Sequence, residues 1–136
     1  MNELIYAGYE CRLTEEQKDM VSPFWFTIGR AYLFAEQNYP CIIYNEHSVA
    51  IGFINLCKWI GTEAFSWSFY IDKDHQGKGY GKSSAALAVE ILKKVDPDMP
   101  IKLSTEQSNV KAQRLYTSLG FIKSDELDGD DLVYVL

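Results

Sequence analysis

Apolar side chains take every second position from Phe65 to Ile71, and serines or a tyrosine fill the positions between them. A period of two is that of a β-strand. Two earlier strands are indicated over residues 41–44 and 49–54, joined by the polar turn 45–48. We therefore expect a β-hairpin followed by a third strand.

The apolar spacing changes to three and four after residue 80. Ala85, Ala88, Leu92 and Val95 fall on one helical face, and Asp96-Pro97 ends that segment. A second stripe of this kind, over residues 112–119, stops before a glycine. Both segments are predicted helices.

The first third of the chain predicts two short helices within residues 14–39. Thr14 and Gln17 have the spacing of a capping box, Pro23 suits the first turn of the second helix, and Pro40 is expected to end it. Further strands are indicated over residues 101–105, 121–127 and 132–135, of which the last two form a hairpin. This order predicts an α/β or α+β fold with one central sheet, in a single domain of residues 1–136.

Composition narrows the classes of function. The chain has 136 residues, 47% apolar and 24% charged, which allows a buried core and argues against disorder. No apolar run approaches the roughly 18 residues of a membrane span, and the start Met1-Asn2-Glu3-Leu4 does not resemble a secretory signal. We expect a cytoplasmic protein without a membrane partner. The net charge of −6 disfavours a nucleic-acid partner and mildly favours a cationic one.

The cysteines and histidines do not suggest a cross-link or a metal site. Cys11, Cys41 and Cys57 have neither paired nor zinc-binding spacing, so we interpret them as reduced packing residues. His47 and His75 stand alone in predicted turns and are expected at the surface. No metal is therefore expected.

Three glycines in five residues connect the strand at 65–71 to the helix that follows. Gly77, Gly79 and Gly81 allow the backbone to come close to a ligand, and N–H groups at the start of a helix bind anions. The ligand is therefore expected to carry phosphate.

The glycine spacing excludes two common phosphate-binding loops. A P-loop would need glycine at position 76, which is Gln76. A dinucleotide fingerprint would need glycine at 82 or 84, where Lys82 and Ser84 stand. Nucleotide hydrolysis and dinucleotide binding are both disfavoured.

The remaining pattern is Q-x-x-G-x-G, with Gln76, Gly79 and Gly81 at the fixed positions. It resembles the acetyl-CoA pyrophosphate loop of the GNAT N-acetyltransferase superfamily, and the order of elements over residues 41–136 matches that family. The resemblance implies a GNAT-like acyl-CoA N-acyltransferase fold, with a central, mostly antiparallel mixed sheet and about four helices. It also implies acetyl-CoA as cosubstrate.

By this resemblance, the end of the strand at 65–71 pairs through its backbone with the pantetheine arm, and the N–H groups of residues 77–82 hold the pyrophosphate. Lys78 and Lys82 either add charge there or are simply solvated. The cofactor-binding residues implied are Phe69, Tyr70, Ile71, Gln76, Gly77, Lys78, Gly79, Tyr80, Gly81, Lys82, Ser83 and Asn109.

Asn109 and Tyr116 are seven residues apart, or two helical turns, and therefore share a helix face. In GNAT enzymes the residue matching Tyr116 usually protonates the departing CoA thiolate, and the residue matching Asn109 usually contacts the cofactor. The alternatives are that Tyr116 only completes an apolar stripe and that Asn109 only caps its helix.

The resemblance implies direct attack of a neutral amine on the thioester, without an acyl-enzyme. The amine must first lose a proton, and Glu63, Asp72, Glu106 or a water chain are the candidates to receive it. The sequence does not choose among them.

Residues 13–23, 42–44 and 72–76 bear a weaker resemblance to the spermine/spermidine acetyltransferases of bacteria, which predicts a polyamine acceptor. Acidic residues between 125 and 131 could attract a polycation or could form a solvated turn. Aromatic residues at 24–26 and at Trp67 depart from that branch; they line an amine site or, more simply, pack in the core.

Two alternative functions stay open: acetylation of a protein or peptide amine, and acetyl-CoA binding without catalysis. The sequence also leaves a homodimer open.

Overall fold

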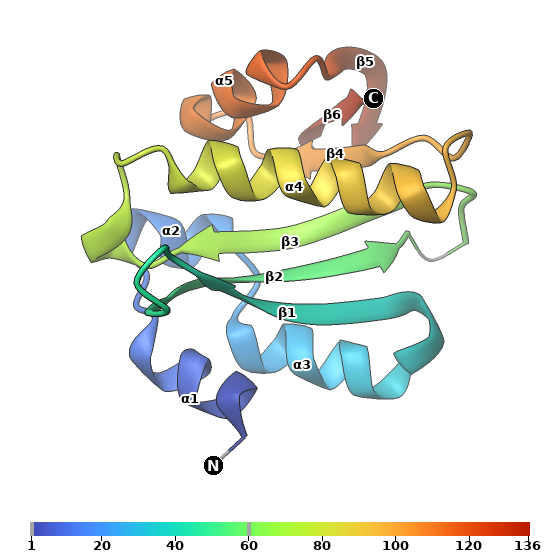
Figure 1. Ribbon diagram of the computed structural model, residues 1–136. Helices are drawn as coiled ribbons and strands as arrows, with labels where there is room; N and C mark the ends of the chain where they lie inside the picture. Colours follow the sequence, from blue (N-terminus) through green and yellow to red (C-terminus); the bar gives the residue numbers. More distant parts are fainter. Residues whose placement is uncertain (1, 60) are drawn as a thin grey trace.

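The computed structural model describes residues 2–59 and 61–136 (Figure 1). Met1, the first residue of the N-terminal segment considered above, lies outside the described residues. The elements, in chain order, are α1 (Glu3–Glu10), α2 (Glu15–Met20), α3 (Phe24–Leu33), the 3-10 turn η1 (Ala35–Gln37), β1 (Asn38–Tyr44), β2 (Ala50–Lys58), β3 (Phe65–Ile71), η2 (Lys73–His75), α4 (Tyr80–Val95), β4 (Lys102–Thr105), α5 (Val110–Ser118), β5 (Ile122–Asp128) and β6 (Asp131–Val135). The predicted mixed α/β class is confirmed. Across the two described stretches, no helix has the length and apolar character to cross a membrane.

The strands form two three-stranded antiparallel sheets, in the orders β1-β2-β3 and β4-β6-β5. The predicted single central sheet is therefore corrected to two sheets that meet at one place. There, Phe65 and Ile101 form an isolated parallel bridge, and the Phe65 N–H donates to the Pro100 carbonyl at 2.8 Å. Beyond this bridge no pairing of β3 with β4 occurs among the described strands, which leaves their facing edges open.

Helices cover both faces of the first sheet (Figure 1): α4 lies over one face, whereas α1 and α3 lie on the other. The side chains of β2 alternate accordingly. Ile54 and Leu56 pack in the larger core with residues of α4 and α5, and Phe53 packs on the opposite face against Phe24 of α3. Because both faces are covered, β2 is apolar along most of its length.

Several local signals act as expected. The Thr14 side chain accepts a hydrogen bond from the Gln17 N–H at 3.2 Å, and the Gln17 side chain accepts one from the Thr14 N–H at 3.0 Å, which completes the capping box. The hairpin of β5 and β6 also closes between Asp128 and Asp131.

Pro40 was expected to end a helix, and this expectation is wrong. It lies inside β1, opposite Asn55 of β2. The helix ends earlier, at Leu33, and η1 follows it. Proline is tolerated in the strand because β1 is the edge of its sheet, where one side of the strand needs no donor.

The helix α1 was not predicted. Its cap is Asn2, whose side chain accepts a hydrogen bond from the Leu4 N–H at 2.8 Å. Gly8 inside the helix weakens the local signal, but a Cβ there would lie 2.2 Å from Cε1 of Phe24. Close packing between α1 and α3 therefore accounts for the glycine.

Candidate functional site

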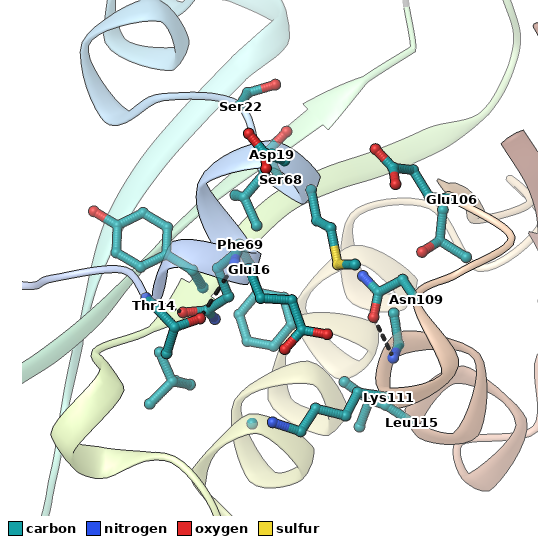
Figure 2. Close-up of a pocket in the computed structure, with 18 of the residues that line it drawn as sticks. Thr14, Glu16, Asp19, Ser22, Ser68, Phe69, Glu106, Asn109, Lys111 and Leu115 are labelled. Atoms are coloured by element: carbon teal, nitrogen blue, oxygen red, sulfur yellow. Dashed lines mark hydrogen bonds between the residues drawn. The ribbon is translucent and has the colours of Figure 1, made fainter.

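A cavity of about 930 Å³ is lined by residues next to the divergence of β3 from β4. Its lining comes from α2, β3, the glycine loop, the end of β4 and the first turns of α5. Figure 2 shows Glu16 and Asp19 of α2 on one side, and Glu106 and Asn109 on the other. Segments far apart in the sequence thus share one concave surface.

The last residues of β3 line this cavity, among them the predicted Phe69, Tyr70 and Ile71. Tyr70 is 4% exposed, and its ring packs against Phe53 in the core on the α1 and α3 side. Tyr70 therefore contributes its backbone, and not its ring, to the cavity lining. An unpaired strand edge presents N–H and C=O groups to a ligand with amides of its own.

The glycine loop begins directly after β3. The Gln76 side chain donates from Nε2 to the Ile71 carbonyl at 2.9 Å, so it fixes the loop to the strand. Gly77 and Gly79 have φ values of 75° and 87°, and a Cβ at either would meet no atom within 4 Å. Both residues need the left-handed region that glycine favours, and both face open space.

The start of α4 has no side-chain cap, and its N-cap residue is Gly79. The first N–H groups of this 16-residue helix are therefore available to an anion, which the helix dipole also attracts. These features fit the pyrophosphate of a CoA thioester.

The other predicted loop residues lie around this helix start. The Lys78 Nζ donates to the Asp74 carbonyl at 3.0 Å, and the Ser83 hydroxyl donates to the Gly79 carbonyl at 3.2 Å. The Tyr80 hydroxyl donates to Glu46 at 2.9 Å, which ties the loop to the β1–β2 turn. Of the predicted loop residues, the cavity is lined by Gln76, Gly77 and Gly81, and not by Lys78, Gly79, Tyr80, Lys82 and Ser83.

Asn109 and Tyr116 both line the cavity, as their shared helix face predicts. Asn109 is also the N-cap of α5, since its Oδ1 accepts a hydrogen bond from the Ala112 N–H at 3.1 Å. The capping role weighed as an alternative is therefore present, and Asn109 faces the cavity as well.

Tyr116 is 8% exposed and packs among Trp67, Phe121 and Tyr134, with ring centroids 5.8–6.5 Å away. Burial raises its pKa to about 12, and hydrogen bonding with the Trp67 side chain has a smaller effect in the opposite direction. A neutral phenol is thus available to a ligand that enters the cavity.

The three proposed proton acceptors differ in position. Glu63 is exposed, forms an ion pair with Lys58 at 3.0 Å, and does not line the cavity. Asp72 is buried, and although burial opposes its charge, hydrogen bonds from the Arg12 and Asp74 N–H groups and from His75 keep its pKa below the usual value. It joins segments of the fold and does not line the cavity. Glu106 does line it.

Sequence reasoning did not single out Glu16 and Asp19, although they fall in the segment 13–23 that resembles the polyamine acetyltransferases. Both line the cavity together with Glu106 and Asp131. Burial, followed by the charges of Glu106, Asp128 and Asp130, raises the pKa of Asp131. The capping box at Thr14 was the available signal, because it fixes which side chains belong to the first turns of α2.

The structure also tests the expectations for the histidine, aromatic and cysteine residues. His75 is not an isolated surface residue, since its Nδ1 lies 3.1 Å from Asp72. Phe24 and Trp67 are buried, whereas Trp25 and Phe26 are 50% and 58% exposed; of this aromatic group, Trp67 lines the cavity. All three cysteines are free, but Cys41 is exposed and so is no packing residue. Within residues 2–59 and 61–136, no group of three or more His, Cys, Asp or Glu side chains could hold a metal ion.

Comparisons with known proteins agree with this geometry. Over 60 residues the chain is 38% identical to a spermine/spermidine N(1)-acetyltransferase of Bacillus subtilis (strain 168), covering 44% of this chain and 40% of that protein. Over 93 residues it is 25% identical to the L-amino acid N-acyltransferase MnaT of Escherichia coli (strain K12), covering 65% and 54%. The chain thus matches about half of these relatives' lengths.

The fold has close counterparts among solved structures. Spermidine N-acetyltransferase from Vibrio cholerae in complex with CoA and spermine superposes with a TM-score of 0.64 at 18% identity, over 82% of this chain and 71% of that one. The family model described as Acetyltransferase (GNAT) family matches residues 5–121. The chain therefore belongs to the GNAT acetyltransferase family.

Proposed function

We propose that this protein transfers an acetyl group from acetyl-CoA to a primary amine, and that the acceptor is a small polycation such as a polyamine. The observation that carries the proposal is a single cavity that brings together the glycine loop, the open edge of β3, Tyr116 and four carboxylates. Each of these features suits one part of the two substrates.

The donor occupies the side of the cavity formed by β3 and α4. Its pyrophosphate lies at the uncapped N-terminus of α4, and its pantetheine amides pair with the backbone of Phe69, Tyr70 and Ile71. Gln76 acts indirectly by holding the loop against the end of β3. Tyr116 lines the same cavity, which supports a position for the thioester close to its hydroxyl.

The acceptor enters past the carboxylates. Glu16 and Asp19 on α2, Glu106 after β4, and Asp131 on β6 give this part of the lining an excess of negative charge, although Lys18 and Lys111 also contribute to it. A chain carrying several ammonium groups gains attraction at more than one of these positions. Spermidine is a molecule of that kind.

The attacking amine must be neutral. An alkylammonium with a pKa of about 10.4 is deprotonated in only about one molecule in 2,500 at pH 7, a cost of roughly 4.6 kcal/mol. Of the carboxylates named from sequence, Glu106 is the one in the cavity, and it takes the proton directly or through water. The neutral amine then attacks the thioester carbon, and no acyl-enzyme forms.

The departing thiolate takes its proton from Tyr116. With the pKa of Tyr116 at about 12, full transfer to a thiolate of pKa about 8.5 would be uphill by about 5 kcal/mol. Proton transfer must therefore accompany C–S cleavage, while sulfur is gaining its charge.

The test is to mix the protein with acetyl-CoA and a panel of amines, namely spermidine, spermine, amino acids and a lysine-containing peptide, and to follow free thiol. We expect polyamine-dependent thiol release, with acetylated polyamine found by mass spectrometry. Selective turnover of the peptide would replace the acceptor class by a protein amine. Binding of acetyl-CoA without turnover of any amine would instead indicate a binding domain.

A further inference from the structure

The indole N–H of Trp67 is a buried donor without a hydrogen bond of normal geometry among the described residues. Trp67 is 7% exposed, and its Nε1 finds no hydrogen-bond partner among the described residues. Buried donors are nearly always paired, so an exception calls for a partner that comes from a ligand or from a change of charge nearby.

Trp67 lies in the cavity beside Tyr116. Both residues line it, one from β3 and the other from α5, and their ring centroids are 6.5 Å apart with an interplanar angle of 67°. Phe121 contacts the indole edge to face, at 5.8 Å and 77°. The indole is therefore held in place by its neighbours, next to the phenol of Tyr116.

We propose that Trp67 is a positioning residue whose Nε1–H donates a hydrogen bond to the Tyr116 oxygen as that oxygen loses its proton. This inference rests on the proposed function. When the C–S bond breaks, the Tyr116 proton moves to sulfur and the phenolate accepts the Trp67 N–H. The proton that the acylated nitrogen loses then restores the phenol through water. Hydrogen bonds to an ionised oxygen are stronger than those to a neutral one, so the donor favours the product side of the transfer.

Among the groups around Tyr116, Trp67 is the best candidate to donate a hydrogen bond to the Tyr116 oxygen. Tyr134 of β6 is the titratable residue packed against the Tyr116 ring, at 5.9 Å, and Glu106, Lys111 and Asp131 are charged groups elsewhere in the lining. Burial is the main influence on the pKa of Tyr116, and Trp67 is the one side chain that acts against it. A donor at Trp67 thus offsets part of the effect of the apolar site.

The inference can be tested without turnover. A fluorinated tyrosine is placed at position 116, and its ionisation is followed by ¹⁹F NMR in the otherwise unchanged protein, in Trp67→Phe, and in the matched control Trp25→Phe outside the cavity. We expect Trp67→Phe to lower the ionisation constant about tenfold and Trp25→Phe to leave it unchanged. An unchanged constant in folded Trp67→Phe would overturn the inference.

A measurement on the intact protein covers the case in which Trp67→Phe does not fold. The ¹⁵N-labelled indole resonance of Trp67 should move as the fluorotyrosine ionises, before any ligand is added. If the chemical shift of this resonance did not change on ionisation and changed only when CoA was added, the N–H would bind the ligand directly. That result would contradict the proposal.

Kinetics then separate this role from a purely structural one. If polyamine acetylation is established, Trp67→Phe should lower kcat about tenfold with little change in the Kd of acetyl-CoA, and should have no further effect in a Tyr116→Phe background. Additive effects of the two substitutions would count against coupling. If no amine is acetylated, the proposed function fails, while the NMR result on Trp67 and Tyr116 still stands.

Discussion

Tyr116 combines a buried position with a chemical task that burial makes harder. At 8% exposure and a pKa of about 12, it is fully protonated at neutral pH, which a proton donor requires. The same burial makes it a weak acid, so its contribution depends on the charge that sulfur develops during C–S cleavage. The pKa also means that loss of the Tyr116 proton cannot limit turnover below about pH 11.

Removal of the Tyr116 hydroxyl should therefore slow the reaction without abolishing donor binding. In Tyr116→Phe we expect kcat to fall about 100-fold, within the range found for general acids, with the Kd of acetyl-CoA changed less than about threefold. Steady-state kinetics and calorimetry are the measurements. Equal loss of kcat and of acetyl-CoA affinity would show that Tyr116 mainly shapes the site.

The raised pKa of Tyr116 also predicts a loss of stability in alkali. The unfolded residue ionises near pH 10, whereas the folded one keeps its proton up to about pH 12, so its contribution is complete below pH 10 and is lost as the pH rises through 12. Wild type should lose about 1.4 kcal/mol more than Tyr116→Phe between pH 8 and pH 11, measured by urea unfolding. Parallel pH curves for the two proteins would refute this.

At the scale of elements, the glycine loop joins β3 to α4 and supplies the proposed phosphate site. Gly77 and Gly61 offer a matched pair, because each has a φ of 75° and each would place a Cβ in open space. Alanine at either position brings a backbone penalty of about 1–2 kcal/mol. Only Gly77 lines the cavity.

Gly77→Ala should therefore weaken acetyl-CoA binding about tenfold, because a shift of φ turns the loop N–H groups away from the phosphates. Gly61→Ala should cost similar stability and leave the affinity unchanged. Isothermal titration with acetyl-CoA, alongside thermal unfolding of both variants, makes the comparison. Equal loss of affinity in both would mean that general destabilisation is responsible.

Elements with a strong local pattern could be predicted from sequence, and those fixed by tertiary contacts could not. The alternation at 65–71 and the stripe at 85–95 correspond to β3 and α4. The helix α1 could not be predicted because Gly8 weakens its local helix signal. The reason for that glycine is the close contact with Phe24, which is a tertiary contact. The local sequence around Pro40 indicates a helix end, because the edge position of β1, which tolerates proline, is a property of the whole sheet.

The candidate site divides in the same way. The loop residues and the shared face of Asn109 and Tyr116 follow from spacing, since both depend on local geometry. Two other features depend on how β3, α5 and β6 pack together: the unpaired N–H of Trp67 and the presence of Asp131 in the cavity. The sequence alone does not give the distances between these elements.

For the molecule as a whole, the separation of its two sheets creates the cavity and collects its charges. The sheets touch through Phe65 and Ile101, and beyond that bridge the cavity receives carboxylates from α2, β6 and the turn after β4. The net charge of −6 adds a long-range attraction for cations. An acceptor with several ammonium groups would sense both the local carboxylates and the overall charge.

This arrangement predicts how acceptor binding depends on α2. The double variant Glu16→Gln, Asp19→Asn removes two cavity carboxylates, and it should raise the KM for spermidine about tenfold while leaving the Kd of acetyl-CoA unchanged. The increase in KM with added salt should also become weaker, because less of the attraction remains to be screened. Both quantities come from initial rates at several ionic strengths.

The same helix supplies the control. Glu15 does not line the cavity, although its partner Lys18, 2.6 Å away, does. Glu15→Gln therefore removes a negative charge beside the lining and leaves all four cavity carboxylates in place. Its KM for spermidine should change less than about twofold, as expected for a screened charge outside the site. If Glu15→Gln raised KM as much as the double variant does, the acceptor would be responding to net charge alone, and α2 would have no specific part in holding it.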